Sequence, residues 1–299
     1  MPMITTQCAI CEEKESIHEL YKARVNMKKI SGKTFSARRT PDSMHYRFVK
    51  CNRCGLIFSN PILPLDKISN FYEKSTFDYS TESNFLKKTY GFYLQKILPR
   101  KRSNLRLLDI GCGNGFFLEE AKALGIGSVY GIEPGKASAQ EAPRWLQKNI
   151  KIEILEKGIF PDNSFDIICC FHTLDHIVDP SEFLTAIFRM LKKDGKVLFI
   201  VHDTDGMSVK LFGEKSPIFD IEHVYLFNKK TLPMLFAKNK FTVQKTFPVK
   251  NTYPLSYWMR MMPLPFGLKK SLIQILKKTK FFNVPISLRA GNIGIIARK

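Results

Sequence analysis

The feature that most constrains this chain is a run of glycines that follows a short apolar segment. Residues 107–117 read LLDIGCGNGFF, so a strand-like stretch leads into glycines at alternate positions and then into a helical pattern. Glycine is used where the backbone turns tightly or where a ligand touches the main chain. This order of strand, glycine loop and helix predicts the nucleotide-binding corner of an open α/β sheet, with the ligand beyond the carboxyl end of the strand.

The spacing of these glycines limits which nucleotide the loop could bind. Gly111, Gly113 and Gly115 form G-x-G-x-G, which differs from the dinucleotide pattern G-x-G-x-x-G and from the triphosphate-binding loop. No Lys-Ser or Lys-Thr pair follows, so a triphosphate would lack its usual partners. Glu133 ends the next predicted strand, where an acidic side chain binds ribose hydroxyls in dinucleotide folds.

Downstream of the loop, strand patterns and helix patterns alternate with short connections. This alternation predicts a parallel sheet with helices on both faces. Pro143 should kink or interrupt the second helix of the series. Two helices, 66–75 and 81–98, are expected before the loop. From the loop onward we expect strands at 105–110, 128–132, 150–154, 165–171, 196–202, 241–247 and 292–298, and helices at 116–124, 136–149, 181–192 and 229–238, the last capped by Asn228.

As a set, these motifs resemble the class I S-adenosylmethionine-dependent methyltransferases. The resemblance covers residues 105–245 and also includes the segments 160–168, 171–180 and 191–198. It implies a Rossmann-like α/β fold with a mostly parallel seven-stranded sheet that binds S-adenosylmethionine. It further implies that the loop and Asp109 meet the methionine part, that Glu133 binds the ribose, and that apolar side chains clamp the adenine. The candidate cofactor-binding residues are therefore Asp109, Gly111, Cys112, Gly113, Gly115, Glu133, Leu155 and Phe171.

Two C-x-x-C pairs near the N-terminus predict a structural zinc site. Cysteine thiolates two residues apart can bind one ion, and a second pair completes a tetrahedron. A redox dithiol is the alternative, but neither pair has the strand–helix context that such a motif needs. The segment after the second pair resembles zinc-ribbon methyltransferases of bacterial surface-glycan clusters. The expected ligands are Cys8, Cys11, Cys51 and Cys54, and the loop between the pairs is basic, with Lys28, Lys29, Lys33, Arg38 and Arg39.

We expect four parts along the 299 residues. They are a zinc ribbon with its basic loop (1–65), a helical connector (66–104), the S-adenosylmethionine-binding core (105–248), and a basic amphipathic insert with the last strand (249–299). No stretch reaches the roughly 18 apolar residues that span a bilayer. With no apolar leader at its start, the chain is expected to be cytoplasmic, including a peripheral location at the inner face of the membrane.

The charge of the chain is concentrated at its C-terminal end. The net charge is +20, yet residues 223–299 contain fifteen Lys or Arg and no Asp or Glu. A surface of one sign favours anionic partners such as phosphates, nucleic acid or acidic lipid. Simple solvated lysine faces are the alternative explanation.

The insert at 249–290 combines aromatic residues with a basic amphipathic segment. Leu268, Leu272, Ile275 and Leu276 share one helical face, with lysines opposite. Such a helix can lie in a membrane interface. A lid packed on the domain is the alternative, and the two are compatible.

Methyl transfer to a hydroxyl requires a base near the sulfonium methyl group. His176 lies in the loop after the fourth predicted strand, and His223 lies in a segment that resembles E-H-x-x-x-F of glycan-modifying relatives. Histidine accepts protons near neutral pH. Both are candidate bases, and a structural role for either is the alternative.

These observations predict a methyltransferase that acts on a sugar or on a lipid-linked or surface glycan. An RNA methyltransferase that uses the ribbon and basic tail is one alternative. A quinone or other small-molecule O-methyltransferase is a second alternative. A protein that only binds the cofactor is a third, which the intact glycine loop and Glu133 disfavour.

Overall fold

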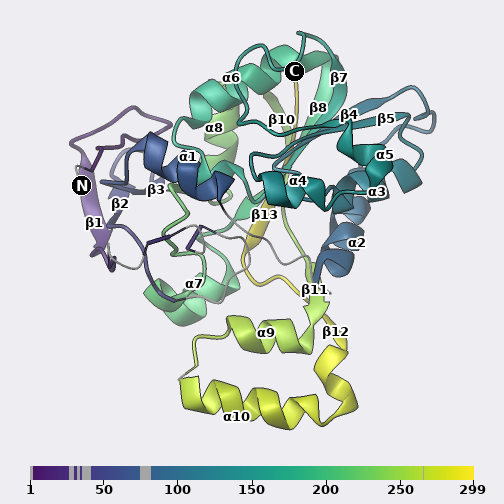
Figure 1. The fold of residues 1–299 in the computed structure, drawn as a ribbon. Helices are drawn as coiled ribbons and strands as arrows, with labels where there is room; N and C mark the ends of the chain where they lie inside the picture. The colour runs from purple at the N-terminus through teal and green to yellow at the C-terminus, as the bar shows by residue number, and fades with distance from the viewer. Residues whose placement is uncertain (1–2, 27–29, 32–33, 36–41, 75–81, 265) are drawn as a thin grey trace.

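The chain folds around one large sheet, to which a smaller N-terminal sheet and a C-terminal hairpin are attached (Figure 1). The computed structural model describes residues 3–26, 30–31, 34–35, 42–74, 82–264 and 266–299. The basic residues Lys28, Lys29, Lys33, Arg38 and Arg39 lie outside the described residues, as do the ends of the predicted helices at Ser75 and Thr81.

The large sheet has seven strands in the order β10-β13-β8-β7-β4-β5-β6. Strand β13 runs antiparallel to both of its neighbours, and the pairs β8-β7, β7-β4, β4-β5 and β5-β6 are parallel. This arrangement confirms the predicted mostly parallel α/β sheet. Its strands are β4 (Arg106–Ile110), β5 (Ser128–Ile132), β6 (Ile150–Lys151), β7 (Phe165–Phe171), β8 (Leu191–His202), β10 (Thr242–Pro248) and β13 (Asn292–Arg298).

Helices cover both faces of this sheet (Figure 1). Helix α6 begins with Pro180 in its first turn, and the Asp179 carboxylate accepts a hydrogen bond from the Glu182 amide at 2.8 Å. Pro143 divides the predicted helix 136–149 into α4 and α5, as the sequence indicated. The helices up to residue 238 are α1 (Leu65–Glu73), α2 (Glu82–Gln95), α3 (Phe116–Ala123), α4 (Lys136–Gln140), α5 (Arg144–Gln147), α6 (Pro180–Met190), α7 (Met207–Phe212) and α8 (Thr231–Lys238).

The core is divided by the sheet into two apolar clusters. Strand β7 contributes to both, because successive side chains of a strand point to opposite faces. Ile168 and Cys170 pack in one cluster, whereas Ile167 and Cys169 pack in the other. This burial on both sides explains why β7 is apolar along almost its whole length.

The N-terminal sheet joins segments that are far apart in the sequence. Its order is β1-β2-β3-β9, and every pair is antiparallel. Strands β1 (Ile17–Tyr21), β2 (Phe48–Cys51) and β3 (Ile57–Ser59) come from the cysteine-rich region, and β9 (Tyr225–Leu226) comes from the second half of the chain. The N-terminal region is therefore built into the rest of the molecule through β9.

The C-terminal insert is a hairpin that carries two helices at its tip. Strands β11 (Asn251–Pro254) and β12 (Pro285–Leu288) pair antiparallel, and α9 (Leu255–Met261) and α10 (Phe266–Lys277) lie between them. In Figure 1 this unit projects from the bottom of the molecule, away from the large sheet. None of the helices within the described part of the chain is both long enough and apolar enough to cross a membrane.

Candidate functional site

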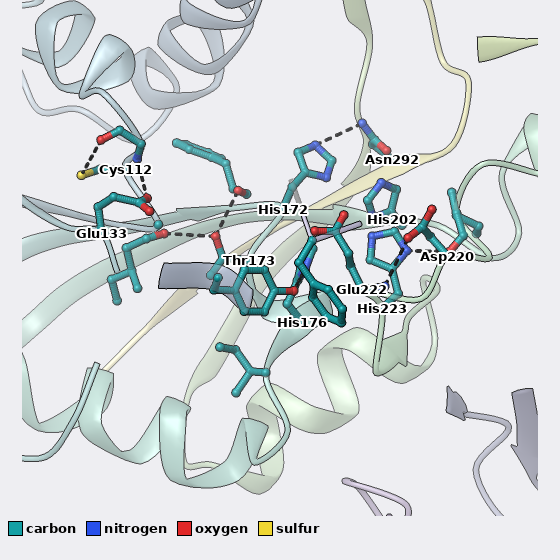
Figure 2. A pocket seen from close by; sticks show the side chains of 18 of the residues that line it. Cys112, Glu133, His172, Thr173, His176, His202, Asp220, Glu222, His223 and Asn292 are labelled. Carbon is teal, nitrogen blue, oxygen red and sulfur yellow. Dashed lines mark hydrogen bonds between the residues drawn. The ribbon is translucent and has the colours of Figure 1, made fainter. Parts of the chain in front are cut away.

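A cavity of about 1280 Å³ lies at the carboxyl edge of the large sheet. Ligand pockets commonly measure about 300–1,000 Å³, so this cavity has room for two small ligands. It is lined by the glycine loop, the end of β5, the loop after β7, helix α7 and helix α9. Figure 2 shows Cys112 and Glu133 on one side and four histidines on the other, with Thr173 between them.

The glycine loop is held in place by Glu133. Its carboxylate accepts hydrogen bonds from the Gly113 amide and from the Gly135 amide, each at 2.8 Å. Gly111 has a φ of 75°, which favours glycine, and its amide donates to the Ile132 carbonyl at 2.9 Å. A Cβ at Gly111 would collide with the Thr173 hydroxyl, so this position also permits close contact with the loop after β7.

One buried and one partly buried carboxylate give this side of the cavity an unusual electrostatic character. Burial raises the pKa of Asp109 well above its ordinary range, and the nearby Glu133 charge raises it further. Burial also raises the pKa of Glu133, while the amides of Gly135 and Gly113 oppose that shift. Among the described residues, Asp109 Oδ1 is buried without a hydrogen-bond partner. A ligand with hydroxyl or amine donors would satisfy these groups.

Apolar side chains complete the glycine-loop side of the cavity. Phe171 stacks on Tyr90 with ring centroids 4.1 Å apart, and Phe117 packs against the edge of Phe171 at 4.7 Å. Leu155, Phe171 and the buried Cys112, which were named from the sequence, all line the cavity.

Two details on the glycine-loop side of the cavity differ from the sequence interpretation. Gly115 does not line the cavity in the described structure. Instead it caps α3 with a φ of 76°, and a Cβ there would collide with Leu146. The predicted strand 150–154 ends at Lys151, and the chain then turns so that Glu153, Ile154 and Glu156 line the cavity.

Four of the six histidines of the chain meet on the other side of the cavity. The ring centroids of His202 and His223 are 4.5 Å apart, those of His172 and His202 are 4.8 Å apart, and those of His176 and His223 are 5.0 Å apart. His172 and His176 follow β7, His202 ends β8, and His223 precedes β9. The topology of the sheet brings these segments together.

The hydrogen bond of His223 fixes which of its ring nitrogens carries a proton, and His176 is bound to a hydroxyl. His223 Nδ1 lies 2.7 Å from the Ile218 carbonyl, so Nδ1 donates and Nε2 is left as the proton acceptor. His176 Nδ1 lies 2.6 Å from the Tyr72 hydroxyl. Burial raises the pKa of Tyr72 well above its ordinary value, helped by the charges of Glu222 and Asp220, so the phenol keeps its proton at neutral pH.

Burial keeps the same two histidines neutral. It lowers the pKa of His176 to about 4, with an opposing contribution from Asp175. It lowers the pKa of His223 well below the ordinary value, and the neighbouring His202 and His176 lower it further. Both of the candidate bases named from the sequence therefore line the cavity as neutral imidazoles at pH 7.

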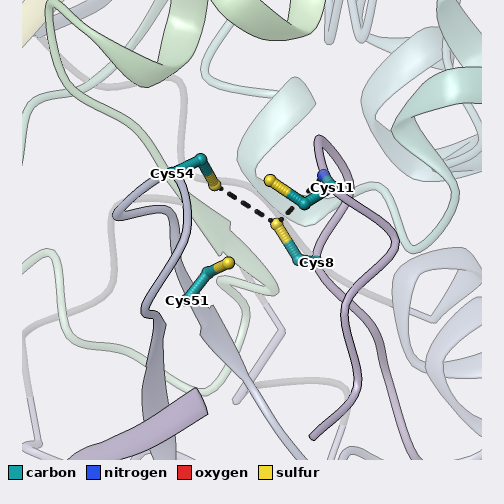
Figure 3. A group of neighbouring side chains, drawn as sticks. All are labelled: Cys8, Cys11, Cys51 and Cys54. Atoms are coloured by element: carbon teal, nitrogen blue, oxygen red, sulfur yellow. Dashed lines mark hydrogen bonds between the residues drawn. The ribbon is translucent and has the colours of Figure 1, made fainter. Parts of the chain in front are cut away.

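The four N-terminal cysteines form a compact group (Figure 3). Their sulfur atoms all lie within 4.8 Å of one another, and Cys8 and Cys54 are 3.4 Å apart. Four thiolates about 2.3 Å from one zinc ion would stand about 3.8 Å from each other, so the donor set fits a closed tetrahedral site. Cys11 is partly exposed and the other three cysteines are buried.

The cysteine-rich region directly supports the segment that carries His223. Strand β3 pairs with β9, and the Ser59 hydroxyl donates to the His223 carbonyl at 2.8 Å. The Tyr225 hydroxyl donates to the Gln7 carbonyl at 2.8 Å, and the Lys238 ammonium donates to the Ala9 carbonyl at 2.8 Å. These bonds connect the wall of the cavity to residues beside the first cysteine pair.

The C-terminal insert closes the cavity from a third side. Tyr253 and Tyr257 stack with centroids 3.8 Å apart, and the Trp258 indole donates to the Ile286 carbonyl at 2.9 Å. Arg260 forms an ion pair with Glu82 at 2.7 Å, which ties the insert to α2. Tyr253, Tyr257 and Trp258 all line the cavity, together with Met261 and Met262.

Comparison with known proteins shows which protein family this chain matches. Residues 84–246 match a family model that is described as a methyltransferase domain. A ubiquinone biosynthesis O-methyltransferase from Pseudomonas putida is 36% identical over 100 residues, which is 31% of this chain and 43% of that protein. The corresponding protein of Pseudomonas syringae is 35% identical over 108 residues, 33% of this chain and 46% of its own length. The match thus spans less than half of each of these relatives.

The fold is also found among solved structures. The YcgJ protein of Bacillus subtilis superimposes with a TM-score of 0.50 at 20% identity, covering 71% of this chain and 98% of that protein. At this level of identity the likeness concerns the fold.

Proposed function

This chain belongs to the methyltransferase domain family and has the fold of the class I enzymes, and from that premise we propose that it methylates a hydroxyl oxygen with S-adenosylmethionine. The observation that carries the proposal is this cavity. It joins the glycine loop and Glu133 to the group of four histidines without a wall between them. A donor and an acceptor bound in these two halves would meet near Thr173.

The residues of the glycine side fit the polar groups of this cofactor. The backbone from Gly111 to Gly113 and the Asp109 carboxylate would hold the methionine part, whose amine would satisfy the buried Asp109 oxygen. Glu133 already accepts two amide hydrogen bonds, and each of its oxygens can accept one more from a ribose hydroxyl. Leu155 and Phe171 would pack against the adenine.

When bound, S-adenosylmethionine supplies a methyl group that its positive sulfur has already activated. The protein then needs to remove the acceptor proton as the new O–C bond forms. His223 is better suited to this step than His176, because its Nε2 is the acceptor nitrogen, whereas His176 Nδ1 is already engaged with the Tyr72 hydroxyl. In this proposal His223 Nε2 would take the hydroxyl proton while the oxygen receives the methyl group that the bound cofactor would supply.

We propose a sugar hydroxyl of a lipid-linked or surface glycan as the acceptor. Aromatic rings can stack on sugar faces, and Tyr253, Tyr257 and Trp258 supply such rings at the cavity wall. A quinone-like phenol is the second candidate. It is favoured by the apolar Met261 and Met262 in the same wall and by relatives that are named as ubiquinone biosynthesis O-methyltransferases. RNA is a third candidate, suggested by the basic C-terminal segment alone.

The zinc ion would serve the structure in this proposal. A closed set of Cys8, Cys11, Cys51 and Cys54 leaves no open position for a substrate. Its role would be to hold the N-terminal sheet, and through β3 and β9 the segment of His223, in place.

An anionic membrane surface is the partner that we propose for the insert. Phe281 is 65% exposed and Ile275 is 62% exposed, and the exposed Lys277, Lys278 and Lys280 lie beside them. Apolar side chains flanked by lysines suit insertion among acidic headgroups. Flotation with phosphatidylglycerol vesicles should recover the protein. Replacing both apolar residues with serine should abolish recovery, and the control Ile152→Ser, another exposed apolar residue, should not.

The acceptor can be identified with labelled cofactor. Purified protein would be incubated with methyl-labelled S-adenosylmethionine and, separately, with lipid-linked glycans, with a demethylated quinone precursor and with total RNA. Label in the glycan fraction is the expected result, and label in either other fraction would reassign the acceptor. If no fraction were labelled and calorimetry showed no binding of S-adenosylhomocysteine, the methyltransferase proposal itself would fail.

A further inference from the structure

We propose that His172, Asp175 and His202 form a binding site for a divalent cation on the acceptor side of the cavity. The three residues offer two imidazoles and one carboxylate, and their ligand atoms all lie within 4.8 Å of one another. His172 and Asp175 follow β7, and His202 ends the neighbouring parallel strand β8. The carboxyl ends of two adjacent strands therefore bring the donors together.

The distance between two of the donors already suits a shared ion. His202 Nδ1 lies 2.8 Å from Asp175 Oδ2. Two ligand atoms about 2.1 Å from one ion and about 90° apart stand about 3 Å from each other. An ion could thus replace the proton between these two atoms with little movement of either side chain. His172 would need to approach by a small shift to complete the set.

The environment of Asp175 favours a cation. Its side chain is fully buried, and Oδ2 also accepts from the His202 amide at 3.2 Å. Within the described part of the chain, Oδ1 has no hydrogen-bond partner. A buried carboxylate normally has its lone pairs satisfied, because an unpaired one costs several kcal/mol. A simple hydrogen bond between Asp175 and His202 explains Oδ2 and leaves Oδ1 unexplained, whereas a cation bound by both carboxylate oxygens would account for both.

The backbone at His172 gives independent support. Its φ is 53°, a left-handed conformation that non-glycine residues adopt at a cost and keep mainly at functional sites. This conformation places the His172 ring 4.8 Å from the His202 ring. The Asn292 amide lies 3.4 Å from His172 Nε2. If the Asn292 amide were turned, its oxygen would accept from His172 Nε2–H, which is the usual outer support of a ligating histidine.

Two imidazoles and one carboxylate suit Mn²⁺, Fe²⁺, Co²⁺, Ni²⁺ or Zn²⁺ and leave coordination positions open. His172 and His202 line the cavity, so the open positions face the acceptor. A cation there would contact the acceptor oxygen and lower the pKa of its hydroxyl, which assists the transfer of the methyl group. This last step rests on the proposed function, whereas cation binding does not.

The test is a titration of the full-length, zinc-loaded protein with Mn²⁺, followed by electron paramagnetic resonance without cofactor or acceptor. Mn²⁺ prefers oxygen and nitrogen ligands to thiolates, so the four cysteines do not compete. We expect about one Mn²⁺ per chain, with hyperfine coupling to imidazole nitrogen. Asp175→Asn and His202→Gln should each weaken binding at least tenfold, and His18→Gln, on an exposed strand, should not.

Unchanged binding of S-adenosylhomocysteine by the variants would show that they remain folded. The proposal would be overturned if neither Mn²⁺ nor Co²⁺ bound at millimolar concentration. It would equally be overturned if binding survived in both variants or depended on Asp220 or Glu222 instead. Because no methyl transfer is measured, either result leaves the proposed reaction to its own test.

Discussion

Glu133 makes the most demanding test of the cofactor site, because one side chain holds the loop and is proposed to hold the ligand. Its two oxygens accept from the Gly113 and Gly135 amides at 2.8 Å. Glu133→Ala would remove the acceptor of both amides and, in the complex, the acceptor of both ribose hydroxyls. The substitution should therefore affect binding and stability by amounts that can be worked out separately.

The binding term should be the larger one. A hydrogen bond to a charged group contributes about 1.5–3 kcal/mol, so two bonds to the ribose contribute about 3 kcal/mol at the low end. That amount corresponds to about a 150-fold increase in the dissociation constant of the ligand. The stability term is smaller. Two partly buried amides lose their acceptor, at about 1 kcal/mol each, while a partly buried carboxylate with a raised pKa is removed as well. The net change in unfolding free energy should stay within about 2 kcal/mol.

Calorimetry with S-adenosylhomocysteine would measure the first quantity and urea unfolding the second. Glu141→Ala is the matched control, since Glu141 is an exposed carboxylate eight residues further along the chain. We expect the control to resemble the natural protein in both measurements. If Glu133→Ala kept its fold and bound within threefold of the natural affinity, the ribose would have to lie elsewhere.

Three further predictions follow from the same structure. First, the pKa of Glu133 is raised in the folded state, so the free energy of unfolding should fall as the pH rises from about 4.3 through the raised value. Urea titrations of Glu133→Gln at the same pH values should not show this fall. Second, His223→Gln should lower kcat about a hundredfold or more without changing the affinity for S-adenosylhomocysteine, whereas His18→Gln should change neither; an unaltered kcat would exclude His223 as the base. Third, a thiol reagent should release about one zinc per chain from the four cysteines. The Val224 amide donates to the Asp175 carbonyl at 2.8 Å, and it should exchange hydrogen faster in Cys54→Ser. Unchanged protection would show that the N-terminal sheet does not support the cavity wall that carries His223.

Much of the central fold could be predicted because its signals are local. Strands β5, β7 and β13 have the predicted bounds, since each is a short apolar run between glycine, polar or charged residues. Pro143 interrupts the second helix because its ring cannot continue the helical hydrogen bonding. The glycine loop and Glu133 also lie where their spacing indicated, because strand, loop and strand follow one another directly in the chain.

Predictions failed or were lacking where a residue's position depends on distant parts of the chain. The sequence did not indicate that Gly115 would be the N-cap of α3 and lie against Leu146. The sequence did not indicate that β3 would pair with β9, more than 160 residues away. His202 was visible only as the end of a strand, and nothing local placed it beside Asp175.

The sequence by itself determined the elements, their alternation, the glycine corner and the two cysteine pairs, because backbone conformation and hydrophobic period are properties of neighbouring residues. Only the tertiary structure decided that four histidines share one cavity wall, that the N-terminal sheet supports that wall, and that the insert covers it. Such contacts depend on the order of the strands in the sheet and on where each crossover connection brings the chain back to the sheet. The spacing of residues within a short segment does not encode that order.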